Sequence, residues 1–126
     1  MRILLVDDDS VFHFIHTKLL HSLGLTEIST ANNGEEALEL LDGQVAGNRP
    51  LPNLIFVDLD MPILDGFGFI EAFKKLIIPQ KEKVEIAILS SSFNPSDINR
   101  AKELGVAHYI NKPISGSTIQ SLINSL

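Results

Sequence analysis

The sequence predicts an α/β fold in which a parallel β-sheet lies between two layers of α-helices. Short apolar runs alternate with amphipathic stretches five times along the chain, which is typical of repeated strand–helix units, (βα)5. The run Leu-Ile-Phe-Val at 54–57 has no polar position, as expected of a strand buried on both faces of a parallel sheet. Polar or charged residues follow four of these runs, at the sheet edge where open α/β folds place their ligands.

The composition is that of an ordinary globular domain. The chain has 126 residues, of which 44% are hydrophobic and 21% charged, enough for one domain with a substantial core. Its net charge of −6 argues against direct nucleic-acid binding, because phosphates need a basic surface. The absence of cysteine excludes disulfides and cysteine chemistry. Neither a membrane span nor a signal peptide is predicted, so we expect a cytoplasmic protein of one domain, residues 1–126, without membrane contact.

Two strand–helix units are predicted in the first half of the chain. Asp9 or Ser10 caps the first helix, which ends at Gly24, and Asn33 caps the second. Residues 42–53 are rich in glycine, asparagine and proline and are predicted to be a loop. The two strands are residues 3–6 and 27–31. The inward side chains are expected at helical spacing: Phe12, Ile15, Leu19 and Leu23 in the first helix, and Ala37, Leu38 and Leu41 in the second.

Three further units are predicted in the second half. Asp65 begins the third helix, Asn94 with Pro95 begins the fourth, and a final amphipathic helix contains Ile119 and Leu122. The strands are residues 54–57, 84–89 and 107–110. Five such units joined by right-handed crossovers favour a flavodoxin-like three-layer sandwich with the strand order 2-1-3-4-5.

The predicted topology brings five residues that can bind a metal ion or take part in phosphoryl chemistry to one edge of the sheet. They follow the first, third, fourth and fifth strands: Asp7, Asp8, Asp58, Ser90 and Lys112. Several carboxylates in one small cleft need a compensating cation, and Mg²⁺ prefers oxygen ligands of this kind. A lysine and a serine hydroxyl complete a site suited to a phosphoryl group, with a carboxylate as the attacking nucleophile. Asp58, at the end of the buried strand, is the expected nucleophile.

With these residues in place, the whole chain resembles the receiver domain of two-component response regulators. The acidic pair Asp7-Asp8 follows the first strand, and residues 58–66 are similar to the D-x-x-M-P-x-x-D-G phosphoacceptor segment of that family. Ser90 stands at the Ser/Thr position of the family, and Tyr109 precedes the pair Lys112-Pro113. These motifs occur in the order and spacing of the family.

The resemblance implies a role for each residue. Asp58 would accept a phosphoryl group from a histidine kinase or a histidine phosphotransfer protein. Asp8, Asp58 and the backbone carbonyl of Asp60 would bind Mg²⁺, and Asp7 would assist through water. Lys112 would pair with Asp58 and then with the phosphoryl group.

The resemblance also implies how the signal leaves the site. Ser90 and Tyr109 would act as the switch, reshaping the surface of residues 94–126 that faces an effector. The Lys112–Pro113 bond would be cis. The protein would not be an enzyme beyond its own phosphotransfer and slow dephosphorylation.

Several alternatives stay open at the sequence level. A stand-alone receiver without an output domain can either bind an effector or relay phosphate. The D-x-D sequence at Asp58 is also similar to the nucleophile of haloacid-dehalogenase-like phosphatases, although their acidic pair follows the nucleophile in the chain. A third reading is an interaction module that has lost phosphorylation. The acidic side chain of Asp60 and the 42–53 loop depart from the family pattern, and the sequence does not assign their effects.

Some prominent residues have simpler structural interpretations. Asp9 and Asp65 fit helix caps. Ser91 and Ser92 fit loop hydroxyls, with Ser92 near the path of attacking water. The histidines are expected at the surface or its boundary, because they lack the further ligands of a metal site: His13, His16, His21 and His108.

Overall fold

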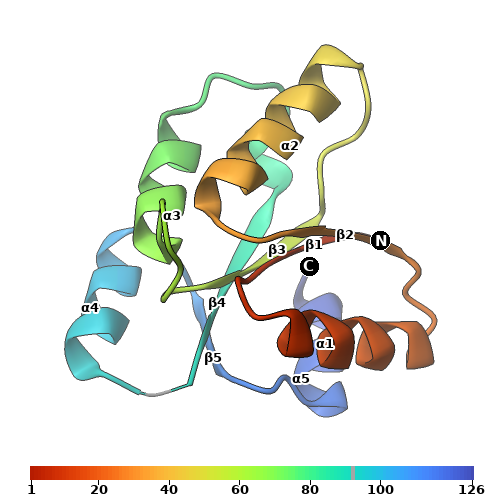
Figure 1. Ribbon diagram of the computed structural model, residues 1–126, viewed down its shortest axis with the longest axis vertical. Coiled ribbons are helices and arrows are strands. Elements are labelled where there is room, and N and C mark those ends of the chain that lie inside the picture. The colour runs from red at the N-terminus through yellow and green to blue at the C-terminus, as the bar shows by residue number, and fades with distance from the viewer. Residues whose placement is uncertain (92) are drawn as a thin grey trace.

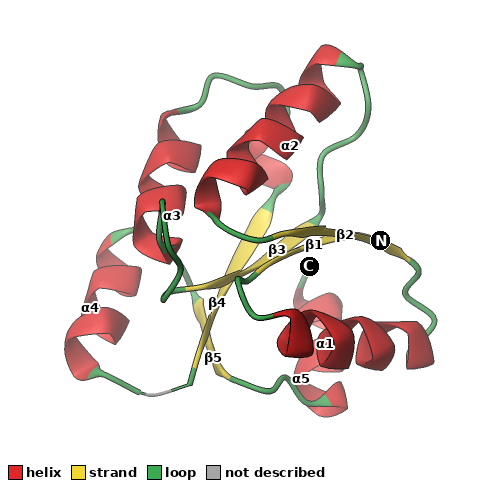
Figure 2. Ribbon diagram, in the orientation of Figure 1, coloured by secondary structure: helices red, strands yellow, loops and turns green. Residues whose placement is uncertain are grey.

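The protein forms one five-stranded parallel sheet with helices on both faces (Figures 1 and 2). A computed structural model describes residues 1–91 and 93–126. The strand order is β2-β1-β3-β4-β5, and all neighbouring pairs are parallel, which confirms the predicted fold. The strands are β1 (Arg2–Val6), β2 (Glu27–Ala31), β3 (Leu54–Asp58), β4 (Glu85–Ser90) and β5 (His108–Asn111).

In the described residues, four α-helices and one short 3₁₀ turn lie between the strands, and a further α-helix follows β5. The helices are α1 (Ser10–Ser22), α2 (Gly34–Ala46), α3 (Gly66–Lys75), α4 (Pro95–Glu103) and α5 (Gly116–Ser125), and the 3₁₀ turn is η1 (Lys81–Lys83). Helices α2, α3 and α4 cover one face of the sheet, and α1 and α5 cover the other (Figure 1). No helix in residues 1–91 and 93–126 is long and apolar enough to span a membrane.

The sheet separates two hydrophobic cores because successive side chains of a strand point to opposite faces. In β1, Leu4 and Val6 belong to the core beneath α2 and α3, whereas Ile3 and Leu5 belong to the core beneath α1 and α5. Strand β3 is buried at every position, as its apolar sequence predicts. The end of β3 is therefore fixed on both sides, which gives the residue there a rigid support.

Side-chain caps begin the α-helices, and all five lie at the carboxyl edge of the sheet. Asp9 accepts a hydrogen bond from the backbone N–H of Val11, which decides between the two predicted caps of α1. The caps of the other α-helices are Asn33, Asp65, Asn94 and Ser115. Each such cap contributes about 1 kcal/mol. Together they fix the turns that carry the candidate site residues.

The structure corrects the predicted loop at 42–53. Helix α2 continues to Ala46, so the connection to β3 begins only at Gly47. Glycine at position 43 costs the helix about 1 kcal/mol relative to alanine. Arg49 offsets this cost, because its backbone N–H donates to the carbonyl of Gln44 and its guanidinium to that of Gly43. The helix end is thus stabilised by a residue that follows it.

The inward face of α1 also differs from the prediction. Its buried residues are His16 and Leu20, whereas Ile15 is 40% exposed. The prediction placed the apolar residues of α1 on its inner face. In the structure α1 packs against residues of β1 and α5, and its buried side is centred one position further along the chain, on His16 and Leu20. The expectation that His16 lies at the surface or its boundary was therefore wrong, because only 2% of the residue is exposed.

Candidate functional site

Asp58 is held at the end of β3 by close packing of α3. Only 5% of Asp58 is exposed. The N–H of Gly66 donates to the carbonyl of Leu59 at 3.1 Å. A Cβ atom at position 66 would overlap the carbonyl oxygen of Asp58 and lie 2.8 Å from the Cα atom of Leu59. Glycine is required at position 66 because the start of α3 touches the backbone that carries Asp58.

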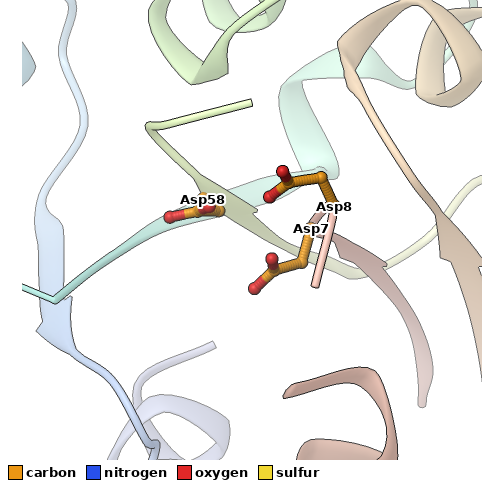
Figure 3. Close-up of side chains that lie close together, drawn as sticks. All are labelled: Asp7, Asp8 and Asp58. Carbon is orange, nitrogen blue, oxygen red and sulfur yellow. The ribbon is translucent and has the colours of Figure 1, made fainter. Parts of the chain in front are cut away.

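Three carboxylates converge at this edge. Asp7 and Asp8 follow β1, Asp58 ends β3, and Figure 3 shows their side chains lying near one another. One oxygen from each carboxylate lies within 4.8 Å of the others. Asp7 and Asp58 are buried, whereas Asp8 is exposed. Oδ1 of Asp7 accepts a hydrogen bond from the N–H of Asp9 at 2.9 Å, which fixes the orientation of this carboxylate.

Lys112 supplies the positive charge within this group. Its Nζ lies 2.8 Å from Oδ2 of Asp7 and 3.4 Å from Oδ1 of Asp58, with only 6% of the side chain exposed. Lys112 therefore contacts both buried acids and lies closer to Asp7, whereas the sequence suggested a pairing with Asp58. The backbone N–H of Lys112 donates to the carbonyl of Ser90 at 2.9 Å. The Lys112–Pro113 bond is cis, as expected.

The electrostatic balance of the site favours an added cation. Burial, with smaller contributions from the charges of Asp7 and Asp60, raises the pKa of Asp58 to about 6, because these effects exceed the opposing attraction of Lys112. At this edge of the sheet, the ammonium group of Lys112 lies beside a cluster of three carboxylates, so the negative charge is only partly balanced. Their oxygen atoms are the hard ligands that Mg²⁺ binds, usually through one or two carboxylates with water in the remaining positions. The donor set therefore fits Mg²⁺.

The structure also places the predicted switch residues. Ser90 ends β4 and is buried. Tyr109 lies in β5, and its ring packs on Phe93 with 5.7 Å between the ring centroids. Asp60 is exposed in the turn after β3. The predicted position near the path of attacking water concerns Ser92, which lies outside the described residues.

The remaining histidines divide into surface and boundary positions, as predicted. His21 is exposed, and half-buried His108 has its Nε2 atom 3.2 Å from Oε1 of Glu85. His13 is half-buried, and its Nε2–H donates to the backbone carbonyl of Asp7 at 2.6 Å. A residue of α1 thus contacts the acidic cluster directly. The sequence offered one sign of this contact: His13 follows Asp7 by six residues, within the first turns of α1, close to the loop where the helix begins.

The backbone conformation of Ile63, between β3 and α3, leads to a prediction about stability. Its φ angle is 69°, a left-handed conformation that is unfavourable for a β-branched residue, and 76% of Ile63 is exposed. Ile63→Gly is expected to raise the free energy of unfolding by about 1 kcal/mol, since glycine adopts this conformation without strain. Urea unfolding measures the change. Ile77→Gly is the control, because Ile77 is fully exposed, and no gain is expected there.

A parallel α/β sheet with a buried aspartate, two further acids and a lysine at its carboxyl edge defines a phosphoacceptor-type signalling domain. The family profile described as "Response regulator receiver domain" matches residues 3–124, and the chain belongs to this family. Receiver domains are signalling modules rather than enzymes, and they bind Mg²⁺ at an acidic pocket.

Known relatives agree with this assignment. The chain is 34% identical over 125 residues to a probable transcriptional regulator, ycf27, of Porphyridium aerugineum, covering 99% of this chain and 47% of that protein. It is 25% identical to a probable chemotaxis protein CheY of Rhizobium etli, covering 100% of this chain and 92% of that protein. A crystal structure of a two-component response regulator from Cytophaga hutchinsonii superposes with a TM-score of 0.89 at 31% identity, covering 98% of this chain and 94% of that one.

The lengths of these relatives limit what they imply. The chain spans about half the length of the ycf27 regulator and most of the CheY protein. The activities of the longer relatives are therefore not transferred to this chain. The expected absence of an output domain stays a prediction, as does the cytoplasmic location.

Proposed function

We propose that the chain is a receiver switch that accepts a phosphoryl group on Asp58. The donor would be a phosphohistidine of a histidine kinase or a histidine phosphotransfer protein. The observation that carries the proposal is the buried Asp58 carboxylate, which lies against Lys112 and within the three-acid cluster at the sheet edge. A carboxylate held rigidly beside a fixed cation is suited to in-line attack on phosphorus.

In the proposed transfer, an oxygen of Asp58 attacks phosphorus while the bond from phosphorus to the donor imidazole nitrogen breaks. The product is an acyl phosphate on Asp58, and the imidazole leaves with the electron pair of that bond. Lys112, 3.4 Å from the attacking carboxylate, would pair with a phosphoryl oxygen. Asp8, Asp58 and the carbonyl of Asp60 would hold Mg²⁺, with Asp7 assisting through water. Bound Mg²⁺ supplies positive charge that neutralises the transferring group.

The signal would leave the site through Ser90 and Tyr109. Ser90 lies at the end of β4, where its hydroxyl would donate to the phosphoryl group. Tyr109 would then move from its contact with Phe93, changing the surface formed by α4, β5 and α5, residues 94–126. The partner at this surface would be an effector protein. Transfer of phosphate onward to a histidine-bearing relay protein is an equivalent use of the same site.

Intact-mass measurement after incubation with Mg²⁺ and acetyl phosphate tests the proposal. The wild type is expected to gain the mass of one phosphoryl group, and Asp58→Asn is expected to gain none, because the amide is not a nucleophile of this kind. Asp42→Asn is the matched control, since Asp42 is an exposed aspartate of α2 outside the acidic edge. It should be labelled like the wild type. Equal labelling of the Asp58→Asn variant would reject the assignment.

A further inference from the structure

A buried histidine of α1 is joined to the loop that carries the site lysine. His16 is 2% exposed, and its Nε2 accepts a hydrogen bond from the backbone N–H of Ile114 at 3.1 Å. Ile114 follows Lys112 by two residues, across the cis bond to Pro113. The hydrogen bond joins residues 98 positions apart in the sequence, so it fixes the β5–α5 loop to α1.

The same histidine is joined to Lys112 through an aromatic ring. The rings of His16 and Phe12 are stacked, with 5.6 Å between their centroids and an interplanar angle of 26°. The Nζ of Lys112 lies 4.2 Å from the centroid of the Phe12 ring. Phe12 therefore contacts His16 and the ammonium group of Lys112 within one stack.

We propose that Phe12 and His16 are positioning residues for phosphoryl transfer, which together set where the ammonium group of Lys112 lies between Asp7 and Asp58. This inference rests on the proposed function of Asp58. His16 fixes the backbone of the loop through Ile114. Phe12 offers a ring face that contacts the ammonium group, 4.2 Å from the ring centroid.

The hydrogen bond explains why position 16 carries an imidazole rather than an apolar side chain. The N–H of Ile114 is buried where it meets Nε2, and a buried donor without an acceptor is costly. Burial lowers the pKa of His16 to about 4, with Lys112 and His13 acting in the same direction and Asp7 opposing them. His16 is therefore neutral at pH 7, with the lone pair of Nε2 available to Ile114.

The ring of Phe12 restricts a side chain that is otherwise flexible. Lysine carries its charge on four methylene groups with many rotamers. In this site Asp7 and Asp58 attract the ammonium group, and the electron-rich face of Phe12 holds it against both acids. Without the ring, Lys112 would pair with Asp7 in several orientations and less often reach the phosphoryl position beside Asp58.

Three replacements of His16 distinguish the effect of its hydrogen-bond acceptor from the effect of its side-chain packing. The amide oxygen of glutamine reaches the position of Nε2, whereas that of asparagine ends near Nδ1, and leucine has no acceptor. The maximal rate of phosphorylation by acetyl phosphate with saturating Mg²⁺, measured by intact mass, is expected to fall about tenfold in His16→Leu and His16→Asn. In His16→Gln we expect a rate within about twofold of the wild type.

A second comparison tests the ring at position 12. Phe12→Leu is expected to slow phosphorylation about fivefold, because leucine keeps much of the apolar volume but has no ring face. Phe14→Leu is the matched control. Phe14 also lies in α1 and has a cation, Nζ of Lys18, 5.3 Å from its ring centroid, but the residue is 63% exposed and lies outside the site. The rate of the Phe14→Leu variant should equal that of the wild type.

Two further measurements distinguish positioning from damaged folding. The Mg²⁺ affinity, measured by titration calorimetry, should stay at the wild-type value in His16→Gln, His16→Asn and Phe12→Leu. Neither His16 nor Phe12 belongs to the cluster of acids. In the wild type, ¹⁵N resonances of the His16 ring should show an unprotonated Nε2 and a protonated Nδ1. These spectra test the geometry without any substitution.

The outcomes separate the two proposals. Equal rates in the wild type, His16→Leu and Phe12→Leu would overturn the positioning inference, and so would a glutamine variant as slow as the leucine variant. A protonated Nε2 in the wild type would overturn it as well. Absence of labelling in the wild type would instead reject the proposed function of Asp58.

Discussion

Replacing Asp58 by asparagine is expected to stabilise the metal-free protein at pH 7 by about 2 kcal/mol. Burial raises the pKa of Asp58 from 3.8 to about 6, so the carboxylate form is disfavoured in the folded protein. Complete linkage over this difference corresponds to about 3 kcal/mol, and we expect less because asparagine also buries a polar group. Lys112 keeps its closer partner, Asp7 at 2.8 Å, so the substitution leaves no lone cation.

The sign of this effect follows from proton binding. Asp58 binds a proton more tightly in the folded state, with a pKa of about 6 against 3.8. Wild-type stability from this group is thus complete below pH 3.8 and is lost as the pH rises through about 6. The advantage of Asp58→Asn should therefore be full above pH 7 and disappear toward pH 4.

Urea unfolding without divalent cations between pH 4 and pH 8 measures this difference. Asp42→Asn is the control, because Asp42 is exposed in α2, away from Asp58, and its replacement should change stability little at any pH. Mg²⁺ should narrow the gap by stabilising the wild type. A constant difference between wild type and Asp58→Asn across this pH range would contradict the assigned cause.

Gly66→Ala is expected to destabilise the protein by about 3 kcal/mol and to slow phosphorylation of Asp58. The new methyl group would overlap the carbonyl oxygen of Asp58 and lie 2.8 Å from the Cα atom of Leu59. Both are backbone atoms of a strand end that is buried on every side, so they cannot move away cheaply. Relief would require α3 to move outward or the carboxylate of Asp58 to turn.

Gly68→Ala is the matched control for this substitution. It lies in the same helix, but its methyl group would meet Cδ1 of Leu64 at 2.6 Å, the end of a flexible side chain. Alanine also favours the helix by up to about 1 kcal/mol. Thermal and urea unfolding should place Gly68→Ala within about 1 kcal/mol of the wild type. If both variants were equally stable, the packing of Gly66 on the end of β3 would not be the tight contact described above.

Much of the fold is predictable because it depends on local patterns. The apolar run of β3 predicts a strand buried on both faces, and Asp65 or Asn94 before an amphipathic stretch predicts a helix start. The alternation of strands and helices, together with the handedness of crossovers, then restricts the order of the sheet. This order brings Asp58 to the same edge as Asp7 and Asp8, so the acidic cluster also follows from chain order.

Other features depend on contacts between distant parts of the chain, and the sequence did not predict them. The end of α2 depends on Arg49, which donates hydrogen bonds to the carbonyl groups of Gly43 and Gln44. The glycine content of this segment had predicted a loop there. The inner face of α1 depends on how the helix lies on α5 and the sheet. No local pattern shows that polar His16 would be buried while Ile15 is exposed.

Local patterns and the order of the elements along the chain were therefore sufficient to predict the class of fold, the acidic edge and the position of Asp58, because periodicity and caps act within a few neighbours. The contact of Lys112 with Asp7, the burial of His16 and its hydrogen bond to Ile114 arise only when α1 and the β5–α5 loop pack together. Each of these contacts satisfies a charge or a buried N–H across nearly the whole chain length. Their stability comes from tertiary packing, which sequence neighbours do not specify.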